Sequence, residues 1–231
     1  MNHTHRDGEC PAGSGEGGLP ALVWIHGGRF TLGAGRDYDA SKLAANGIVV
    51  VTINHRLGAL GFLAHPALAS EPGGPSGNYG LMDQQVALRW VQGNIRPFGG
   101  DPDNVTIAGQ SSGGLSVLAH MISRGSRGLF HRAIVQSGSF AMTQQSLAAA
   151  EADGEAFAAK AGCPDQTADC LRGLPVADLV SNFPSSAIPG VVDGAVLESR
   201  SGRRWPPGGS PACRSSTGST MMRNGTSSPQ R

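Results

Sequence analysis

Short apolar runs alternate with helical patterns through the middle of this sequence. Continuous apolar runs rich in β-branched residues occupy 21–25 and 48–53, and such runs are typical of strands covered on both faces. Two further strand candidates lie at 104–108 and 133–136. Because helical patterns separate several of these runs, the order of elements predicts an α/β fold, with a mostly parallel sheet and helices on both faces.

Two stretches have the three- and four-residue spacing of apolar side chains that predicts a helix. The first covers 81–95, with Asn78 or Asp83 available near its start as an N-cap. The second covers 112–122 and follows directly on the strand predicted at 104–108. The sequence shows no internal repeat of fixed period, so a solenoid is not expected.

The composition changes along the chain and divides it into three parts. Residues 1–18 are polar and Gly-rich, which predicts a disordered N-terminal segment. Residues 19–198 contain all the predicted strands and helices, and we expect them to form one partial α/β domain. Residues 199–231 are rich in Arg, Ser, Gly, Pro and Thr. Since this tail has no apolar run long enough to bury a face, we expect it to be disordered or translated out of frame.

Charge and hydropathy exclude several classes of protein. The 231 residues carry 18 basic and 17 acidic side chains without a Lys/Arg stripe, so nucleic-acid binding is not expected. The longest apolar run, 47–53, is too short to span a bilayer. Residues 1–18 also lack the apolar stretch of a secretory signal. The compartment stays open: cytoplasmic by default, or extracellular if the true start lies upstream.

The four cysteines, Cys10, Cys163, Cys170 and Cys213, do not have the spacing of metal ligands. Cys163 and Cys170 are close enough for a local disulfide loop. In the absence of an export signal, however, we favour two ordinary thiols in a helical region. The sequence also lacks a dinucleotide fingerprint and a phosphate-binding loop, so we expect neither a metal ion nor a cofactor.

The candidate chemistry lies at Ser111, in the sequence Gly-Gln-Ser-Ser-Gly at 109–113. This is a G-x-S-x-G motif between a predicted strand and a predicted helix, the context of a nucleophile elbow. The glycines keep side chains away from a tight, strained turn that pushes the serine hydroxyl outward. The turn also leaves the backbone N–H of Ser112 at a helix N-terminus, where it can stabilise an oxyanion.

A second segment has the form of an oxyanion loop. His26, Gly27 and Gly28 follow the strand predicted at 21–25, as in the loops whose backbone N–H groups complete the oxyanion hole of lipases and esterases. A simple turn closing the strand is the alternative interpretation. The combination with Ser111 favours the oxyanion loop.

At four motifs the sequence resembles the type-B carboxylesterases, which include cholinesterase-like enzymes of the α/β-hydrolase superfamily. They are VWIHGGRF (23–30), NHRLGALGF (54–62), GNYGLMDQ (77–84) and FGGDPDNVTIAGQSSG (98–113). With 136–138 and 189–194, the resemblance covers roughly residues 19–198.

The resemblance implies an α/β-hydrolase fold and hydrolysis of small-molecule esters without a cofactor. It implies Ser111 as the nucleophile and the backbone N–H groups of Gly28, Arg29 and Ser112 as the oxyanion hole. Two positions depart from the family pattern: the family often has Gly or Ala at the position of Arg29, and Glu at that of Gln110. A bulky side chain at residue 29 leaves the backbone donor in place but could narrow the acyl pocket.

Ester hydrolysis by this mechanism also needs a general base and an acid that follow the serine in the chain. His120 and His131 are the histidines that follow Ser111, and neither is placed on a late loop that could return to it. We interpret both as surface or packing residues. Asp193 is a candidate acid, but its Val-Val-Asp-Gly setting is more typical of a strand ending in a turn. Family members are about twice this long, so we expect this chain to be an N-terminal portion with weak activity or none.

The tail suggests a reason for the missing residues. Read with codons displaced by one base and suitable synonymous codons, residues 212–223 become Val-Pro-Val-Leu-x-Gly-x-x-x-Asp-Glu, which is similar to the family segment that carries the triad acid. We hypothesise that the tail is an out-of-frame translation, which the nucleotide sequence tests. The alternative is a genuine disordered tail.

A non-catalytic, cholinesterase-like binding protein is the alternative function. A domain that only binds a partner does not need the strained turn at Ser111, so this turn favours the catalytic function over the alternative. Labelling of Ser111 by an organophosphate or fluorophosphonate distinguishes the two functions.

Overall fold

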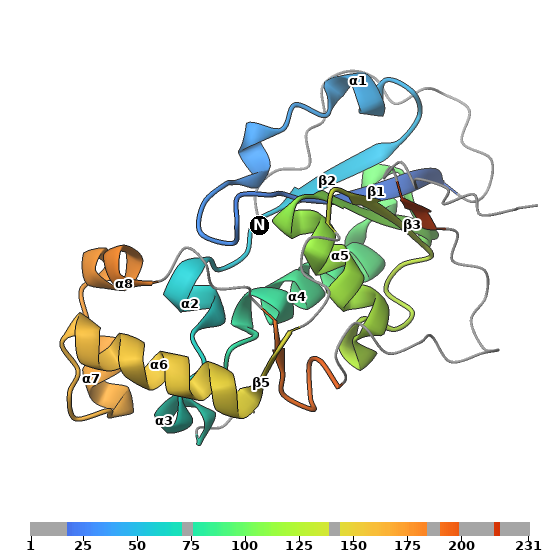
Figure 1. Ribbon diagram of the computed structural model, residues 1–231. Coiled ribbons are helices and arrows are strands. Elements are labelled where there is room, and N and C mark those ends of the chain that lie inside the picture. Colours follow the sequence, from blue (N-terminus) through green and yellow to red (C-terminus); the bar gives the residue numbers. More distant parts are fainter. Residues whose placement is uncertain (1–17, 71–75, 139–143, 184–189, 199–214, 218–231) are drawn as a thin grey trace, which may run out of the picture.

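A five-stranded parallel sheet forms the centre of the computed structural model, which describes residues 18–70, 76–138, 144–183, 190–198 and 215–217 (Figure 1). Its strands lie in the order β2-β1-β3-β4-β7, and every neighbouring pair is parallel. Their bounds are β1 Leu19–Ile25, β2 Val49–Ile53, β3 Gly100–Gln110, β4 Arg132–Gln136 and β7 Ser215–Thr217. The apolar runs therefore form parallel strands, as the sequence predicts.

Strand β3 is much longer than the strand predicted at 104–108. It begins at Gly100 and ends at Gln110. The first residues of β3 were not predicted as a strand because their sequence, Gly-Asp-Pro-Asp, is typical of a turn. The pairing of β1 with β3 shifts register here, since Pro20 lies opposite Asp101 and Ala21 lies opposite Val105. Proline cannot donate a ladder hydrogen bond, which fits an irregularity at this point of the sheet.

Helices α4 (Tyr79–Asn94) and α5 (Ser112–Ile122) lie on one side of the sheet, and the short helix α1 (Ser41–Ala44) lies on the other (Figure 1). Both long helices were predicted, α5 with its observed bounds and α4 at 81–95. Alternate residues of the strands pack against α4 and α5 and form the main core. This core contains Val23, Ile25, Val51, Ile53, Val105, Ile107, Ala133 and Val135 from the strands and Leu88, Val91, Ile95 and Val117 from the helices or their ends.

Asn78 occupies the N-cap position of α4, but its side chain makes no capping hydrogen bond, contrary to our expectation. Its amide instead pairs with the backbone of Val191: Nδ2 donates to the Val191 carbonyl at 2.8 Å, and Oδ1 accepts the Val191 N–H at 3.0 Å. The Asn78 amide is therefore used to hold a distant segment and not to cap α4, so tertiary structure overrides the local signal.

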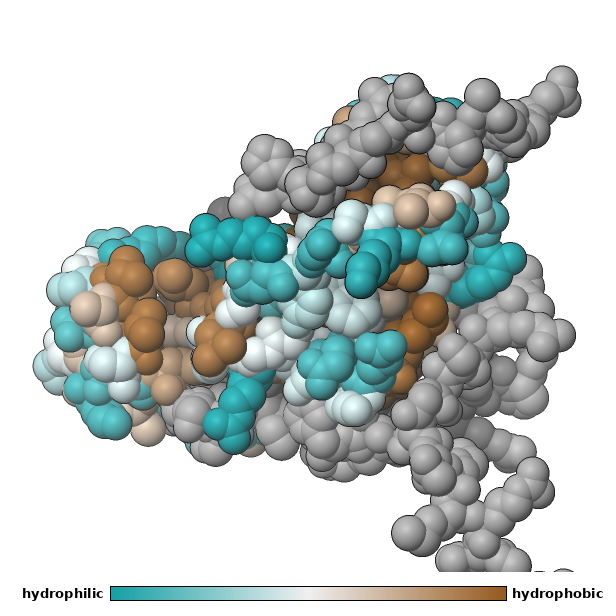
Figure 2. Space-filling model, turned by 90° about the horizontal axis from the view of Figure 1, so that it is seen from above, coloured by the Kyte–Doolittle hydropathy of each residue, from teal (hydrophilic) through white to brown (hydrophobic). Residues whose placement is uncertain are grey.

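The remaining helices form a second group beside the sheet (Figure 1). They are α2 (Gly58–Phe62), α3 (Pro66–Ala69), α6 (Leu147–Ala161), α7 (Ala168–Gly173) and α8 (Val176–Asn182), with 3-10 turns elsewhere at Gly35–Asp37, Arg96–Phe98 and Arg124–Ser126. Strands β5 (Gln145–Ser146) and β6 (Val191–Val192) pair separately. Leu63, Phe157 and Leu171 are among the buried residues that join this group into a core of its own. Figure 2 shows apolar surface over this end of the molecule, where Val176 is 61% and Val180 is 68% exposed.

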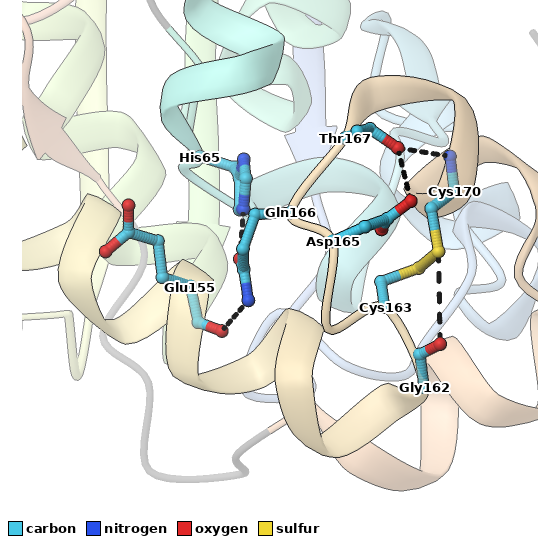
Figure 3. The surroundings of a disulfide bond; sticks show 8 residues. All are labelled: His65, Glu155, Gly162, Cys163, Asp165, Gln166, Thr167 and Cys170. Atoms are coloured by element: carbon cyan, nitrogen blue, oxygen red, sulfur yellow. Dashed lines mark hydrogen bonds between the residues drawn. A yellow bond between two sulfur atoms is a disulfide. The ribbon is translucent and has the colours of Figure 1, made fainter.

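Cys163 and Cys170 form a disulfide, so our prediction of two ordinary thiols was wrong (Figure 3). The chain turns back between them because the Thr167 hydroxyl accepts the backbone N–H of Cys170 at the start of α7. This brings their Cα atoms to 5.7 Å, within the range that a disulfide spans. Cys163 is fully buried in the core of the helical group. The bond therefore fixes the end of α6 to the beginning of α7.

Reduction of this disulfide is expected to lower the free energy of unfolding by about 2.5 kcal/mol, from the loop-closure entropy of a short loop. Urea unfolding with and without dithiothreitol measures the difference. The double variant C163A/C170A is the control, and dithiothreitol should not shift its unfolding midpoint. If the reductant leaves the wild-type midpoint unchanged as well, the bond does not stabilise the fold.

The predicted terminal segments lie almost entirely outside the described residues. Residues 1–17 are not described, and of the tail at 199–231 only β7 is. Disorder of these segments and translation of the tail out of frame therefore stay predictions. Within the part of the chain that is described, no helix is long and apolar enough to cross a membrane.

Candidate active site

Ser111 lies at the carboxyl end of β3 and immediately before α5, where the motif placed it. Its backbone has φ 55° and ψ −121°, a conformation that L-residues rarely adopt. Close packing around the turn explains the glycines. A Cβ on Gly113 would lie 2.0 Å from the Ile25 carbonyl oxygen, and one on Gly109 would lie 2.4 Å from the Gly113 carbonyl. The strained serine is thus held by backbone atoms on both sides.

The neighbouring strand fixes the other side of the turn. The backbone N–H of Ser111 donates to the carbonyl of Gln136, at the end of β4, over 2.8 Å. Gly114 and Gly138 pack against each other so closely that a Cβ on Gly138 would lie 2.5 Å from the Gly114 carbonyl carbon. The Ser111 side chain therefore extends from a rigid junction of two strands and one helix, and the residue is half-buried.

The predicted oxyanion loop touches this turn. A Cβ on Gly27 would lie 3.4 Å from the Ser111 Cβ, so the two motifs meet at the carboxyl edge of the sheet. Gly28 has φ 114° and Arg29 has φ 58° in the tight turn that follows. Within the described residues, the backbone N–H groups of Gly28, Arg29 and Ser112 donate no hydrogen bond. These three backbone donors, without an acceptor in the described part of the chain, thus lie on two segments in contact, where the motifs predicted an oxyanion hole.

Two aromatic contacts support the predicted oxyanion loop, and neither was predicted from the sequence. The Phe30 ring is 4% exposed and packs edge-on against Phe62, with ring centroids 5.0 Å apart. The Phe30 carbonyl accepts the Gly58 N–H at 2.7 Å. The His26 ring stacks on the His55 ring at 4.6 Å. Phe62, Gly58 and His55 all belong to the motif at 54–62, which was the available signal.

His55 is held neutral in this position. Burial, and then the neighbouring His26, lower its pKa from 6.5 to about 3, against the opposing influence of Asp83. Asp83 forms a two-pronged ion pair with Arg56, whose Nε and terminal nitrogen each donate to the carboxylate at 2.8 Å. The hydrogen bonds that the Arg56 guanidinium donates to this carboxylate raise its pKa.

His120 and His131 lie far from Ser111. His120 is nine residues further along α5, about 13 Å along the helix axis. It is fully buried and bonded to Gln84 at 2.8 Å and Ser126 at 2.9 Å, and burial lowers its pKa to about 4. The His131 ring accepts the N–H of Val105, which lies about five residues before the end of β3. This contact therefore lies roughly 16 Å from the Ser111 turn along the strand. Our interpretation of His120 as a packing residue is confirmed by these contacts.

Asp193 serves the turn that follows β6, as its sequence setting indicated. Its Oδ1 accepts the N–H groups of Ala195, Val196 and Leu197 at 2.9–3.0 Å. Its Oδ2 accepts from the Asn78 amide at 2.7 Å. Both oxygens therefore hold structure, and neither is available to orient a catalytic histidine in this arrangement.

One group of potential metal ligands has a different explanation. Among the described residues, Cys163, Asp165 and Cys170 place their ligand atoms within 4.8 Å of one another. The two sulfurs are bonded to each other, however, and a disulfide sulfur is not the thiolate that binds a metal ion (Figure 3).

Acidification is expected to destabilise the fold through His55 and His120. Both pKa values are lowered in the folded state, so between pH 6.5 and about 4 the unfolded chain binds more protons. The stabilisation is complete above pH 6.5 and is lost as the pH falls, at up to about 1.4 kcal/mol per pH unit for each histidine. Urea unfolding at pH 7, 6, 5 and 4.5 measures this slope. The variant H55F keeps a ring that cannot titrate and should show a smaller slope. An identical slope in wild type and H55F would contradict the role of His55.

The family model for the carboxylesterase family matches residues 10–206. The chain belongs to the carboxylesterase family. It is 48% identical over 166 residues to para-nitrobenzyl esterase of Bacillus subtilis (strain 168), covering 70% of this chain and 33% of that protein. It is 50% identical over 147 residues to fumonisin B1 esterase of Sphingopyxis macrogoltabida, covering 62% of this chain and 27% of the relative.

Solved structures agree with this assignment. Carboxylesterase EST55 of Geobacillus stearothermophilus superposes with a TM-score of 0.74 and 40% identity, over 80% of this chain and 41% of the esterase. The parallel sheet and its helices are therefore the α/β-hydrolase fold that the resemblance implied. This carboxylesterase-family chain spans less than half the length of each of these relatives.

Proposed function

We propose that this carboxylesterase-family chain supplies the nucleophile and the oxyanion hole for the hydrolysis of small-molecule carboxylic esters. The Ser111 Oγ attacks the ester carbonyl carbon, and its proton passes to the leaving alcohol as the ester C–O bond breaks. Water then attacks the acyl-serine, releases the acid and restores the hydroxyl. None of these steps calls for a metal ion or a cofactor.

The observation that carries this proposal is the contact between two strained segments. Ser111 has a positive φ at a strand-to-helix turn, and the glycine loop approaches it so closely that a Cβ on Gly27 would lie 3.4 Å from its Cβ. Strain of this kind persists only where the surrounding structure enforces it, and it clusters at functional sites. A nucleophile beside free backbone donors supports acyl transfer.

The free N–H groups of Gly28, Arg29 and Ser112 are the proposed donors to the oxyanion of the tetrahedral intermediate. Ser112 begins α5, so its N–H lies at the positive end of a helix dipole. Such donors bind the negative charge that develops on the carbonyl oxygen only during the reaction. They therefore stabilise the transition state more than the bound substrate, which lowers the activation barrier.

A general base and an acid complete such a mechanism. Within the described residues, neither His120 nor His131 lies near Ser111, and Asp193 is occupied by backbone N–H groups. We therefore propose that the 231-residue chain by itself is at most weakly active.

Covalent labelling tests the nucleophile. A fluorophosphonate reacts when the serine oxygen adds to phosphorus, fluoride leaves and the hydroxyl proton passes to water. Fluoride departs readily, and the strained turn and the proposed oxyanion donors remain, so we expect a slow adduct that accumulates over hours without a positioned base. Mass spectrometry should find the adduct on Ser111, none in S111A, and an unchanged adduct in S181A, which alters an exposed serine on α8. A chain that stays unlabelled would favour the non-catalytic binding protein.

A further inference from the structure

Arg29 carries a long cationic side chain at a backbone position that disfavours side chains. Its φ is 58°, in the left-handed region, and such a conformation costs a non-glycine residue roughly 1–2 kcal/mol. The neighbouring Gly28, at φ 114°, meets the same turn without that cost. Phe30 shares this conformation at φ 61°, but its ring is buried against Phe62, whereas the side chain of Arg29 is exposed and packing does not explain it.

The residue lies at the rim of the site. A Cβ on Gly27 would lie 3.4 Å from the Ser111 Cβ, and Arg29 follows two residues later, at most about 7 Å further along the chain. Arg29 is exposed to solvent, whereas Ser111 is half-buried and Ser112 is buried. The guanidinium stands five bonds from its Cα, so it can reach a group attached a few bonds from the ester carbonyl.

The charge of Arg29 is not neutralised within the described part of the chain, where it forms no ion pair. The nearest acid in the sequence, Asp37, accepts the backbone N–H of Ala34 and lies 4.0 Å from Arg36. Leu32, at the other end of the same turn, presents an apolar side chain that is mostly exposed. Among the described residues, the guanidinium of Arg29 therefore has no acidic partner, and it belongs to the loop that contacts the Ser111 turn.

We propose that Arg29 makes this site selective for esters that carry a carboxylate, such as half-esters of short dicarboxylic acids. The inference rests on the proposed function, because it concerns the substrate that Ser111 attacks. A guanidinium presents two parallel donors that match a carboxylate, and it keeps its charge at every relevant pH. In the proposed complex the guanidinium binds the carboxylate of the substrate while the backbone donors bind the carbonyl oxygen, so the substrate is held at both ends.

Two matched fluorophosphonates test the selectivity, one with a neutral short alkyl tail and one with a terminal carboxylate on a tail of the same length. Each labelling rate of Ser111 is divided by the rate at which that probe hydrolyses in buffer. The readout is the ratio of the anionic to the neutral probe, because a general change in the loop alters both rates. We expect a ratio of about ten in wild type, the size of one charge-assisted contact at a solvent-accessible site.

Four variants and one change of salt separate the causes. R29Q should bring the ratio close to one, R29K should retain about threefold because it lacks the planar fork, and R29E should reverse the preference. R89Q, which removes an exposed arginine from α4, should keep the wild-type ratio. Raising the salt concentration to 0.5 M should reduce the ratio in wild type but not in R29Q.

The outcomes distinguish the two proposals. Equal ratios in wild type and R29Q would overturn the role of Arg29 and leave the proposed function in place. Failure of both probes to label Ser111 would overturn the proposed function and the inference that rests on it.

Discussion

The 231-residue chain is expected to hydrolyse p-nitrophenyl butyrate at least about a thousandfold more slowly than a carboxylesterase with a complete catalytic triad. Ser111 and the proposed oxyanion donors lie on segments in contact, but neither His120 nor His131, the histidines that follow Ser111, lies near enough to take the serine proton. His120 and His131 are separated from Ser111 by about 13 and 16 Å. His26 and His55 stack on each other beneath the oxyanion loop.

Steady-state hydrolysis beside para-nitrobenzyl esterase of Bacillus subtilis measures this difference under identical conditions. S111A is the control, because any residual rate that depends on the nucleophile must disappear in it. Turnover of the wild-type chain within tenfold of the reference enzyme would show that a base reaches Ser111 after all, and would refute the proposed weak activity.

The second large effect is expected from G113A, which should lower the free energy of unfolding by at least about 3 kcal/mol. The added methyl group would lie 2.0 Å from the Ile25 carbonyl oxygen and 2.7 Å from that of His26. Both are backbone atoms at the carboxyl end of β1, so neither can move away as a flexible side chain would. The elbow must shift, and with it the contact between Ser111 and the oxyanion loop.

Urea unfolding followed by circular dichroism measures the loss, and G93A provides a matched control. Gly93 lies near the end of α4, and a Cβ there would meet nothing within 4 Å. The same substitution should therefore stabilise the protein by about 0.5–1 kcal/mol, through helix propensity alone. If G113A unfolds at the same urea concentration as wild type, the close packing at the elbow has been overstated.

Periodicity and motif spacing were sufficient to predict strands β1 to β4 and helices α4 and α5, but not strand β7 or helix α6. The β-branched runs at 21–25 and 48–53 favour buried strands, and α5 follows the serine turn directly. The part of β3 between Gly100 and Asn104 could not be predicted. Its polar residues pair with the start of β1, and that pairing depends on a register shift between distant segments.

Contacts between remote segments also account for the other differences. The sequence offers Asn78 as a helix cap, but Val191 captures its side chain from more than a hundred residues away. The spacing of Cys163 and Cys170 allowed a disulfide, but the lack of an export signal favoured two thiols, and the turn at Thr167 that brings the cysteines together could not be predicted.

The candidate site also contains residues that could be predicted from the sequence and residues that could not. Ser111 and Gly28 could be located from short motifs, because the turn that each requires demands glycine at fixed positions. The contacts that support the predicted oxyanion loop could not be predicted from short motifs. The Phe30 ring packs on Phe62 and the His26 ring stacks on His55, and both contacts join separate elements. Hydrophobic patterning treats these rings as ordinary core residues.

The strand order β2-β1-β3 has a consequence for synthesis of the chain. Val23 pairs with Val51 on one side and with Ile107 on the other. The first partner follows soon after β1 leaves the ribosome, whereas the second is translated several seconds later. Until then one edge of β1 has no partner, and closing that long loop carries an entropic cost. A chaperone that binds extended apolar segments therefore has its best access to the nascent chain during this interval.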